Sequence, residues 1–530
     1  MQLNGMFAFA LVDTERRTFL LARDRLGVKP LYYEIRPGQI RFASELKALL
    51  AWRDASRAID SAAVAEYLAL NYLSNETCIF QGYKKLPPAH WLAGSLDAPN
   101  QTRVAPYWHL ELNGEQGDGA LAQSEQDELA NLLRDAVNIR LRSDVPLGIF
   151  LSGGLDSSLV ATLSAQSSNG HRPLALTVGF AEREYDETIL ARATAERAGL
   201  EHRIIPQEPS SLTNVDRLAW FYDEPFGDAS ALPTFALCEA ASKHATVFLS
   251  GDAGDEAFGG YRRYIESARH SRLLRRTARY IPAWSSRWMP TLSAWRYRLE
   301  KLTLPDAGWA AAFDGIPQDP ALELLAHPDL RPLLKSAGNV MWRRWAQSRG
   351  DALTARQQAL DYALYLPDDI LVKMDRASMA HSIEVRSPFL DYRVVEWAAR
   401  LPRAKLLNSQ EGKLPLRKLG EQLLPPSVNT GIKRGFGVPL DAWFREPAGQ
   451  SFARERLLSK QAQARGWWKV DAVAQLIAAH QSGRGRDFGA LLWRLLFLDA
   501  WARQYGDTNS FLQGYAIEKD LQSKYEPRLA

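Results

Sequence analysis

The first 45 residues alternate between short apolar runs and polar or Gly/Pro-containing breaks. Four of these runs, at residues 6–12, 18–22, 31–35 and 40–43, have the length of single strands. Apolar runs of this length between turn-forming residues are typical of strands joined by tight turns. The pattern therefore predicts antiparallel sheet in this part of the chain.

A different pattern begins near residue 125. A predicted helix at about 125–141 is followed by continuous apolar runs at 145–151, 174–180 and 246–249, with helical patterns between them. Strands that are apolar throughout and alternate with helices indicate a parallel sheet covered on both faces. Ligands bind such sheets at the carboxyl ends of the strands, where the loops after the first and third runs fall.

The stretch between these two patterns is rich in Gly, Asn, Asp and Gln, which is typical of an exposed connection. We therefore expect a first domain over residues 1–95, a linker over 96–124, and a second domain over 125–505. The second domain is expected to be mostly helical after about residue 262, and a polar tail follows at 506–530. Two domains or more fit a chain of 530 residues.

The composition, 46% hydrophobic and 24% charged, is that of a folded globular protein, and the net charge of +4 indicates no particular acidic partner. Only Cys78 and Cys238 occur, far apart, which fits a reducing compartment and no zinc or disulfide spacing. The N-terminus lacks a secretory leader pattern, and Arg494 and Asp499 interrupt the apolar stretch 491–501. We therefore expect a soluble, cytoplasmic protein.

The first candidate for chemistry is Ser-Gly-Gly-Leu-Asp-Ser-Ser at residues 152–158. It follows a predicted buried strand and opens a predicted helix, so its backbone N–H groups converge on an anion. A plain glycine turn with a helix cap is the alternative, but the complete motif in this context favours phosphate binding. No Gly-Lys-Ser/Thr follows, so it is not a Walker A loop, and release of the terminal phosphate alone is disfavoured.

A second loop, Ser-Gly-Asp-Ala-Gly-Asp-Glu at residues 250–256, holds three carboxylates among small residues. A solvated acidic loop is the alternative explanation. Carboxylates that face a phosphate site suit Mg²⁺, which prefers oxygen ligands and bridges phosphate oxygens. We therefore predict Asp156 of the first loop and Asp255 of the second as Mg²⁺ ligands.

A third charged run spans residues 366–391, and taken alone its charges could form ion pairs along a helix. In this order and at this spacing, however, the three runs resemble the glutamine-dependent asparagine synthetases and their relatives. The resemblance extends over roughly residues 3–445 and includes further segments at 5–9, 23–32, 43–49 and 433–439.

The resemblance implies a fold class and a reaction. The fold would be α/β, with a parallel-sheet ATP-pyrophosphatase domain, of the adenine nucleotide α-hydrolase type, preceded by a partial N-terminal-nucleophile-type β-sandwich. A carboxylate, that of L-aspartate, would attack the α-phosphate of ATP to give an acyl-adenylate and Mg-pyrophosphate. Ammonia would then give L-asparagine and AMP. The implied partners are small molecules, with homodimers occurring in the family, and neither nucleic acid nor membrane.

The resemblance also assigns roles to matching positions. Asp252 would help to form the intermediate, and Lys413 would be the catalytic lysine, although Pro415 departs from the family pattern in that stretch. Charge develops first on the leaving pyrophosphate, where loop amides and Mg²⁺ would stabilise it. Charge then develops at the acyl carbon, where a lysine would stabilise it. The nucleotide would be bound by Phe150, Ser152, Gly153, Gly154, Asp156, Ser157, Val178, Ser250 and Gly251. The pocket for the acid could include Glu384, Arg386 and Asp391.

The glutaminase half of this family uses an N-terminal cysteine whose α-amine is the base, with an Arg loop, an Asn-Gly-Glu segment and an Asp that bind glutamine. None of these occurs within residues 1–95, which resemble the glutaminase half, and neither cysteine can substitute. We interpret this as an N-terminal truncation; reliance on free ammonia or on a partner is the alternative. Amide formation with ammonium but not with glutamine is therefore expected.

Three other functions stay open. A ligase for another carboxylate, as in the β-lactam synthetases, would keep both loops and differ in the pocket. A nucleic-acid-modifying pyrophosphatase would explain the arginine-rich stretch 262–298, although such a stretch is more often a solvated amphipathic helical face. A catalytically silent remnant is the third.

Overall fold

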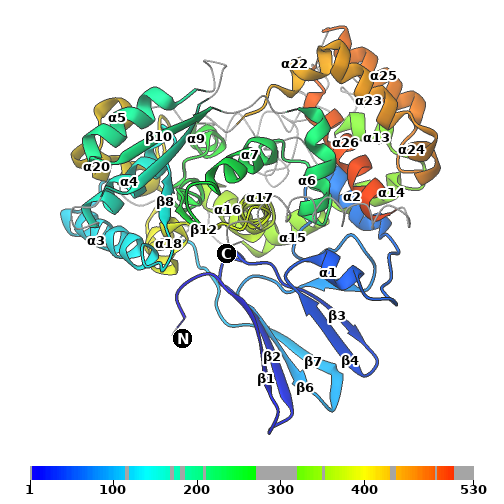
Figure 1. The fold of residues 1–530 in the computed structure, drawn as a ribbon, viewed down its shortest axis with the longest axis horizontal. Coiled ribbons are helices and arrows are strands. Elements are labelled where there is room, and N and C mark those ends of the chain that lie inside the picture. Colours follow the sequence, from blue (N-terminus) through cyan, green and yellow to red (C-terminus); the bar gives the residue numbers. More distant parts are fainter. Residues whose placement is uncertain are drawn as a thin grey trace.

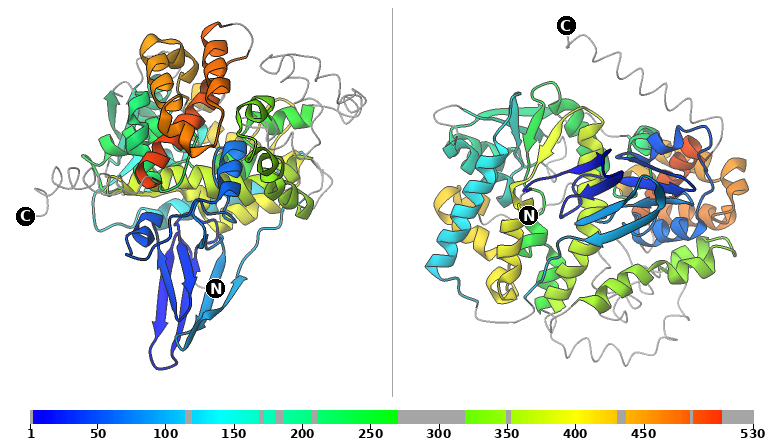
Figure 2. Two further views of the ribbon diagram at one scale, coloured as in Figure 1. Left: turned by 90° about the vertical axis from the view of Figure 1, so that its right-hand side faces the viewer. Right: turned by 90° about the horizontal axis from the view of Figure 1, so that it is seen from below.

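The computed structural model describes residues 3–113, 119–167, 172–179, 186–206, 211–269, 319–348, 353–429, 437–483 and 486–506. Within them the chain forms two small antiparallel sheets and one parallel sheet, with many helices (Figure 1). The antiparallel sheets project from one side of the helical body in both side views, Figure 1 and the left panel of Figure 2. The fold class is thus α/β with a parallel sheet and antiparallel sheets.

The N-terminal strands form as the sequence pattern predicts. One sheet has the order β1-β2-β6-β7 and the other the order β4-β3-β5. A small core of Phe19, Leu21, Leu31, Tyr33, Leu86 and Leu92 lies between them. The strands are β1 (Ala8–Asp13), β2 (Thr18–Arg23), β3 (Tyr32–Arg36), β4 (Gln39–Ala43), β5 (Tyr83–Lys85), β6 (His90–Ser95) and β7 (Ala98–Pro106).

Strand β7 lies within the expected linker, so residues that the sequence pattern assigned to an exposed connection form a strand instead. It pairs antiparallel with β6, with a register shift between Gly94 and Ser95. As an edge strand it keeps most of its side chains partly or fully in solvent, so its polar composition resembles that of a loop. Of the expected linker, residues 114–118 lie outside the described residues.

The parallel sheet has the order β10-β9-β8-β11-β12. Its strands are β8 (Leu147–Phe150), β9 (Leu174–Gly179), β10 (Glu201–Pro206), β11 (Val247–Leu249) and β12 (Glu384–Arg386), and every paired strand is parallel to its neighbour. The three central strands match the three predicted apolar runs. The strand order reverses between β8 and β11, which is the position where ligands bind in open parallel sheets.

Helices cover both faces of this sheet, which explains its continuous apolar strands. On one face, side chains such as Ile149 and Leu249 share a core with α3 (Gln123–Arg140), α4 (Leu155–Ser167) and α5 (Thr188–Ala198). On the other face, Phe150, Leu176 and Phe248 share a larger core with α6 (Val215–Tyr222), α7 (Ala231–Ala241) and α17 (Leu371–Met379).

The C-terminal helix α26 (Gly489–Tyr505) is buried in the larger core, next to α6. Its two charged residues that interrupt the apolar stretch have protein partners. Arg494 donates to the carbonyl oxygen of Leu68 (2.5 Å) and to Asn71 Oδ1 (3.0 Å), and Asp499 pairs with Arg456 (2.7 Å). Among the described helices, none is long and apolar enough to cross a membrane.

The remaining helices complete the body around these cores (Figure 2, right). A π-helical segment, Asp361–Ile370, leads into α17, and Pro367 lies inside it. The other helices are α1 (Leu46–Leu50), α2 (Ser61–Leu70), α8 (Gly254–Phe258), α9 (Arg262–Arg269), α13 (Pro320–Leu325), α14 (Arg331–Ala337), α15 (Asn339–Gln347), α16 (Leu353–Leu360), α18 (Tyr392–Arg400), α19 (Arg403–Leu406), α20 (Leu414–Leu423), α21 (Pro426–Asn429), α22 (Leu440–Arg445), α23 (Pro447–Leu457), α24 (Lys460–Arg465) and α25 (Val470–Gln481).

Candidate functional site

The loop at residues 152–158 joins β8 to α4 at the carboxyl edge of the sheet, as the sequence predicts. The hydroxyl oxygens of Ser152 and Ser157 are 2.8 Å apart, and Ser152 Oγ accepts the N–H of Gly154 (3.1 Å). The N–H of Gly153 donates to a carboxylate oxygen of Glu187 (3.2 Å). A loop amide thus already holds an anionic oxygen, which is the interaction that phosphate binding requires.

The loop at residues 250–256 follows β11 and packs directly against the first loop. A Cβ atom at Gly251 would lie 2.8 Å from the backbone nitrogen of Ser157, and one at Gly254 would lie 2.6 Å from Cγ of Asp156. A Cβ atom at Gly251 would therefore displace the backbone of the first loop, and one at Gly254 would displace the Asp156 side chain. The two motifs, about a hundred residues apart in sequence, therefore form one site.

Asp252 is held at the edge of this site. Its carboxylate accepts the hydroxyl of Ser250 (2.8 Å), and its carbonyl oxygen accepts the hydroxyl of Ser387 (2.6 Å), which follows β12. The ends of β11 and β12 are thereby tied together. The structure brings Asp252 into the same loop cluster as the predicted nucleotide-binding residues.

Lys413 reaches this cluster from the start of α20. Its ammonium group pairs with Asp156 and lies 2.8 Å from Asp255, and its side chain is only 8% exposed. Its backbone is in the left-handed region (φ 58°), with its N–H donating to Phe258 (3.0 Å). Burial by itself would lower the pKa of Lys413, but Asp156 and Asp255 outweigh it and raise the pKa above its usual value. The lysine is therefore charged at neutral pH.

The two carboxylates fit the predicted Mg²⁺ ligands, because they converge on a cation. In this structure that cation is the Lys413 ammonium, between Asp156 and Asp255. Carboxylate oxygens are the donors that Mg²⁺ prefers, usually together with substrate phosphates and water. The donor set is therefore appropriate for a magnesium ion at this edge of the sheet.

Phe150 and Val178, predicted to border the nucleotide, lie at the carboxyl ends of adjacent strands β8 and β9 and are nearly buried. The Phe150 ring stacks on Phe248, with centroids 4.5 Å apart and an interplanar angle of 3°. Phe150 lies two residues before the first loop in sequence, and Val178 lies on the neighbouring strand.

The three residues expected in the acid pocket lie around Arg140, whose side chain pairs with Asp391 and whose carbonyl oxygen accepts a hydrogen bond from Arg386. Asp391 is fully buried at the start of α18 and pairs with Arg140 (3.0 Å) and Arg393 (3.0 Å). Burial alone would raise the pKa of Asp391, but these arginines lower it below its usual range. Asp391 thus already has partners within the protein.

Glu384 and Arg386 pair with each other (2.6 Å) and line a cavity of ≈ 260 Å³. Asn4, Gly5 and Arg140 also line it. The cavity lies where the N-terminal segment meets the end of α3, and Glu384 is paired with Val247 at the amino end of β11, away from the loops.

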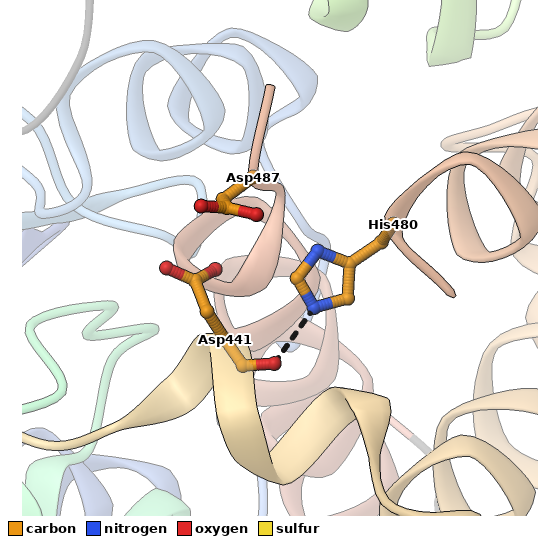
Figure 3. A group of neighbouring side chains, drawn as sticks. All are labelled: Asp441, His480 and Asp487. Carbon is orange, nitrogen blue, oxygen red and sulfur yellow. Dashed lines mark hydrogen bonds between the residues drawn. The ribbon is translucent and has the colours of Figure 1, made fainter. Parts of the chain in front are cut away.

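A second group of potential metal ligands, Asp441, His480 and Asp487, lies among α22, α25 and α26, with donor atoms within 4.8 Å of one another (Figure 3). His480 Nδ1 accepts the N–H of Phe488 (3.1 Å), so its proton is on Nε2, which donates to the carbonyl oxygen of Asp441 (3.1 Å). The Asp441 carboxylate accepts the N–H of Gly489 (2.9 Å). Because both ring nitrogens are already used, we assign this group a structural role.

Neither cysteine has the surroundings of a nucleophile. Cys78 and Cys238 are both buried, and burial raises the pKa of each thiol well above its usual value.

Most of the arginine-rich stretch 262–298 lies outside the described residues, as do residues 433–436 of the matching segment 433–439. Of the described arginines in that stretch, Arg263 pairs with Asp361 (2.7 Å) and is mostly buried. That arginine is therefore not part of a solvent-facing basic surface.

Sequence reasoning gave no role to three residues that the structure places near Asp252: Asp228, Ser230 and Lys373. Lys373 pairs with Asp228 (2.7 Å), and the charge of Asp252 acts on it. Lys373 lies 145 residues from Asp228 in sequence, so no local pattern indicated this contact. Glu187, which accepts the N–H of Gly153 in the first loop, lies 34 residues away in sequence and likewise gave no local signal.

Comparison with known proteins agrees with this geometry. A family model described as asparagine synthase matches residues 128–503, and one described as a glutamine amidotransferase domain matches residues 1–108, which includes β7. A putative glutamine-hydrolyzing asparagine synthetase of Mycobacterium bovis is 32% identical over 514 residues, covering 94% of this chain and 76% of the relative.

Two further relatives show the range of the similarity. Glutamine-hydrolyzing asparagine synthetase 1 of Bacillus subtilis is 28% identical, covering 94% of this chain and 77% of the relative. Amidase chyE of Penicillium rubens is 27% identical, covering 83% and 70%. The loops, the lysine between their carboxylates and the length of these matches lead to one conclusion: the chain belongs to the asparagine synthase family of ATP-dependent carbon–nitrogen ligases.

Proposed function

We propose that this chain converts L-aspartate to L-asparagine, with ATP cleaved to AMP and pyrophosphate and with ammonia as the nitrogen donor. The observation that carries the proposal is the contact between the two loops through Lys413, which pairs with Asp156 of one loop and Asp255 of the other. Such a site presents amides, carboxylates and one cation to a single polyphosphate.

In the first step, an oxygen of the substrate carboxylate attacks the α-phosphorus of ATP. The bond between the α-phosphorus and the bridging oxygen breaks, and pyrophosphate leaves with that oxygen. The amides and hydroxyls of residues 152–158 bind the pyrophosphate, and Ser250 and Gly251 border the nucleotide. Donors placed where negative charge develops lower the barrier more than donors to the ground state.

In the second step, the nitrogen of ammonia attacks the acyl carbon, and AMP leaves with the oxygen that came from the acid. A proton is lost from nitrogen to give the neutral amide. The Lys413 ammonium stabilises the charge on the phosphate oxygens in both steps, and Asp252 contributes to the first. Mg²⁺ held by Asp156 and Asp255 would neutralise charge on the polyphosphate.

At the level of fold, we propose that the parallel-sheet part is an ATP-pyrophosphatase domain of the adenine nucleotide α-hydrolase type. The antiparallel sheets would be part of an N-terminal-nucleophile-type β-sandwich. The reversal of strand order beside the two loops and the stacking of the two small sheets support these assignments.

The nitrogen donor follows from the cysteines. A glutaminase of the proposed type needs a thiolate nucleophile, whereas Cys78 and Cys238 are buried thiols with raised pKa values. The chain of this sequence is therefore expected to use ammonium, and glutamine without added ammonium should give no asparagine.

The test is pyrophosphate release from ATP and Mg²⁺ with candidate acids, each with ammonium or glutamine. The proposal predicts release with aspartate and ammonium, together with asparagine. Lys413→Met should lower the rate at least 100-fold, in the range found when a transition-state donor is removed. Lys418→Met, which removes an exposed lysine of α20, is the matched control and should be unaffected. Absence of release with aspartate, or turnover by glutamine alone, would contradict the proposal.

A further inference from the structure

Lys373 and Asp228 form an ion pair beside the proposed catalytic site. Lys373 Nζ lies 2.7 Å from Asp228 Oδ2 and donates to Ser230 Oγ (2.8 Å). Ser230 in turn donates its hydroxyl (2.6 Å) and its N–H (2.9 Å) to Asp228. The pair is therefore held in a fixed geometry by a third residue.

The topology places this pair on the same edge of the sheet as the two loops. Asp228 and Ser230 directly precede α7, which leads into β11, and Lys373 is in the first turn of α17, which leads into β12. A helix that leads by a short connection into a strand ends near the amino end of that strand, so its first turn lies toward the carboxyl edge. Both groups thus flank the loop that carries Asp252.

The charges around the pair are unequal. Three carboxylates, those of Asp228, Asp369 and Asp252, act on the single ammonium of Lys373. The side chains of Lys373 and Asp228 are partly accessible, at 13% and 19%. A ligand that carries both an ammonium and a carboxylate would match both signs.

We propose that Lys373 and Asp228 recognise the amino-acid head group of the acceptor acid. Lys373 binds the carboxylate that does not react, and Asp228 binds the α-ammonium, so the second carboxylate of the acid extends toward Asp252 and the phosphates. The inference rests on the proposed function and assigns specificity to residues outside both loops. Charge-assisted hydrogen bonds supply such discrimination, because a missing partner leaves a buried charge unpaired.

The experiment measures pyrophosphate release with three acids that differ by one group. Aspartate has both head-group charges, β-alanine lacks the non-reacting carboxylate, and succinate lacks the ammonium. Lys373→Met should raise the KM for aspartate roughly 10- to 100-fold and leave that for β-alanine nearly unchanged. Asp228→Asn should raise the KM for aspartate by a similar factor and leave that for succinate nearly unchanged. The KM for ATP should stay the same in both variants.

Lys373→Arg should recover part of the affinity. Arg217→Met is the matched control. It removes another ion pair of this region, between Arg217 of α6 and Glu239 of α7 (3.1 Å). It should leave all three acids unaffected.

An equal rise in the KM for all three acids, or a rise in the KM for ATP, would show that the ion pair has only a structural role. Either result would overturn the inference and leave the proposed function intact. A wild-type chain that uses only acids without an α-amino group would also overturn it. Absence of pyrophosphate release by the wild type with any acid would instead refute the proposed function, and the inference with it.

Discussion

Asp368 is a buried carboxyl group between the N-terminal sheets and the helical body. It accepts hydrogen bonds from the backbone N–H of Asn75 (2.9 Å) and from its side-chain amide (3.1 Å). Burial raises the pKa of Asp368 to about 7, against the opposing effects of Lys85 and Arg23. The group therefore titrates near neutral pH.

This pKa predicts a pH-dependent stability. Because the folded pKa lies above the unfolded value of about 3.9, the stability due to neutral Asp368 is fully present below pH ~4 and is lost as pH rises through about 7. Asp368→Asn stays neutral throughout. Between pH 5.5 and 8.5 the free energy of unfolding of the wild type should fall by about 2 kcal/mol more than that of the variant. Urea unfolding at both pH values measures this, and parallel profiles would refute it.

The two glycine-containing loops are the elements on which nucleotide binding depends. Their close approach at Gly251 requires the absence of a Cβ atom, since the nearest atom is backbone and cannot rotate away. The helix that follows each loop fixes the position of its amides.

Gly251→Ala should therefore weaken nucleotide binding more than it weakens the fold. We expect the KM for ATP to rise at least tenfold, since displaced loops lose several phosphate contacts. Gly199→Ala is the control, because a Cβ at that helix end meets no atom within 4 Å and only the left-handed backbone is strained, at a cost of about 1 kcal/mol. The control should bind ATP as the wild type does, and an equal KM effect would contradict the account.

The sequence alone predicted the elements whose environment is uniform along the strand. The central strands β8, β9 and β11 are apolar on both faces, so continuous runs marked them. Strand β10 lies at a sheet edge with four of its six residues exposed, and β12 carries the charged residues Glu384 and Arg386, so neither gave such a run. Local pattern carries no information about an edge strand that packs little surface.

The sequence predicted those parts of the candidate site that are formed by residues close together in the chain. Both loops were found because a strand, a loop and a helix follow one another in sequence. The meeting of Lys413 with Asp156 joins positions 257 residues apart, so only the family resemblance indicated that lysine. The negative charge of Asp391 likewise did not indicate that this residue forms ion pairs with arginines of the protein itself.

The whole molecule is joined at Asp223, which has contacts in three regions. Its carboxylate accepts the N–H of Leu46 (2.8 Å) and pairs with Lys47 (2.9 Å) and Arg376 (3.2 Å), and its carbonyl oxygen accepts the indole N–H of Trp501 (2.8 Å). The N-terminal half, α17 and the C-terminal helix α26 thus meet at one fully buried group.

Removal of this carboxylate should destabilise the molecule strongly. Asp223→Ala leaves Lys47 and Arg376 without their buried partner, and we expect a loss of about 3–5 kcal/mol in the free energy of unfolding. Asp97→Ala, which removes an exposed partner of Arg17, is the control and should change the free energy of unfolding little, because solvent screens an exposed ion pair. Denaturant unfolding compares them, and similar losses for both would refute a central role of Asp223.

The central claim, that this site adenylates a carboxylate, is tested most directly by isotope transfer. The chain is incubated with ATP, Mg²⁺, ammonium and aspartate labelled with ¹⁸O in its carboxylates, and the nucleotide product is analysed by mass spectrometry. The account predicts AMP that carries one ¹⁸O atom, in equal amount with pyrophosphate and asparagine. Formation of ADP and inorganic phosphate, or of AMP without label, would contradict it.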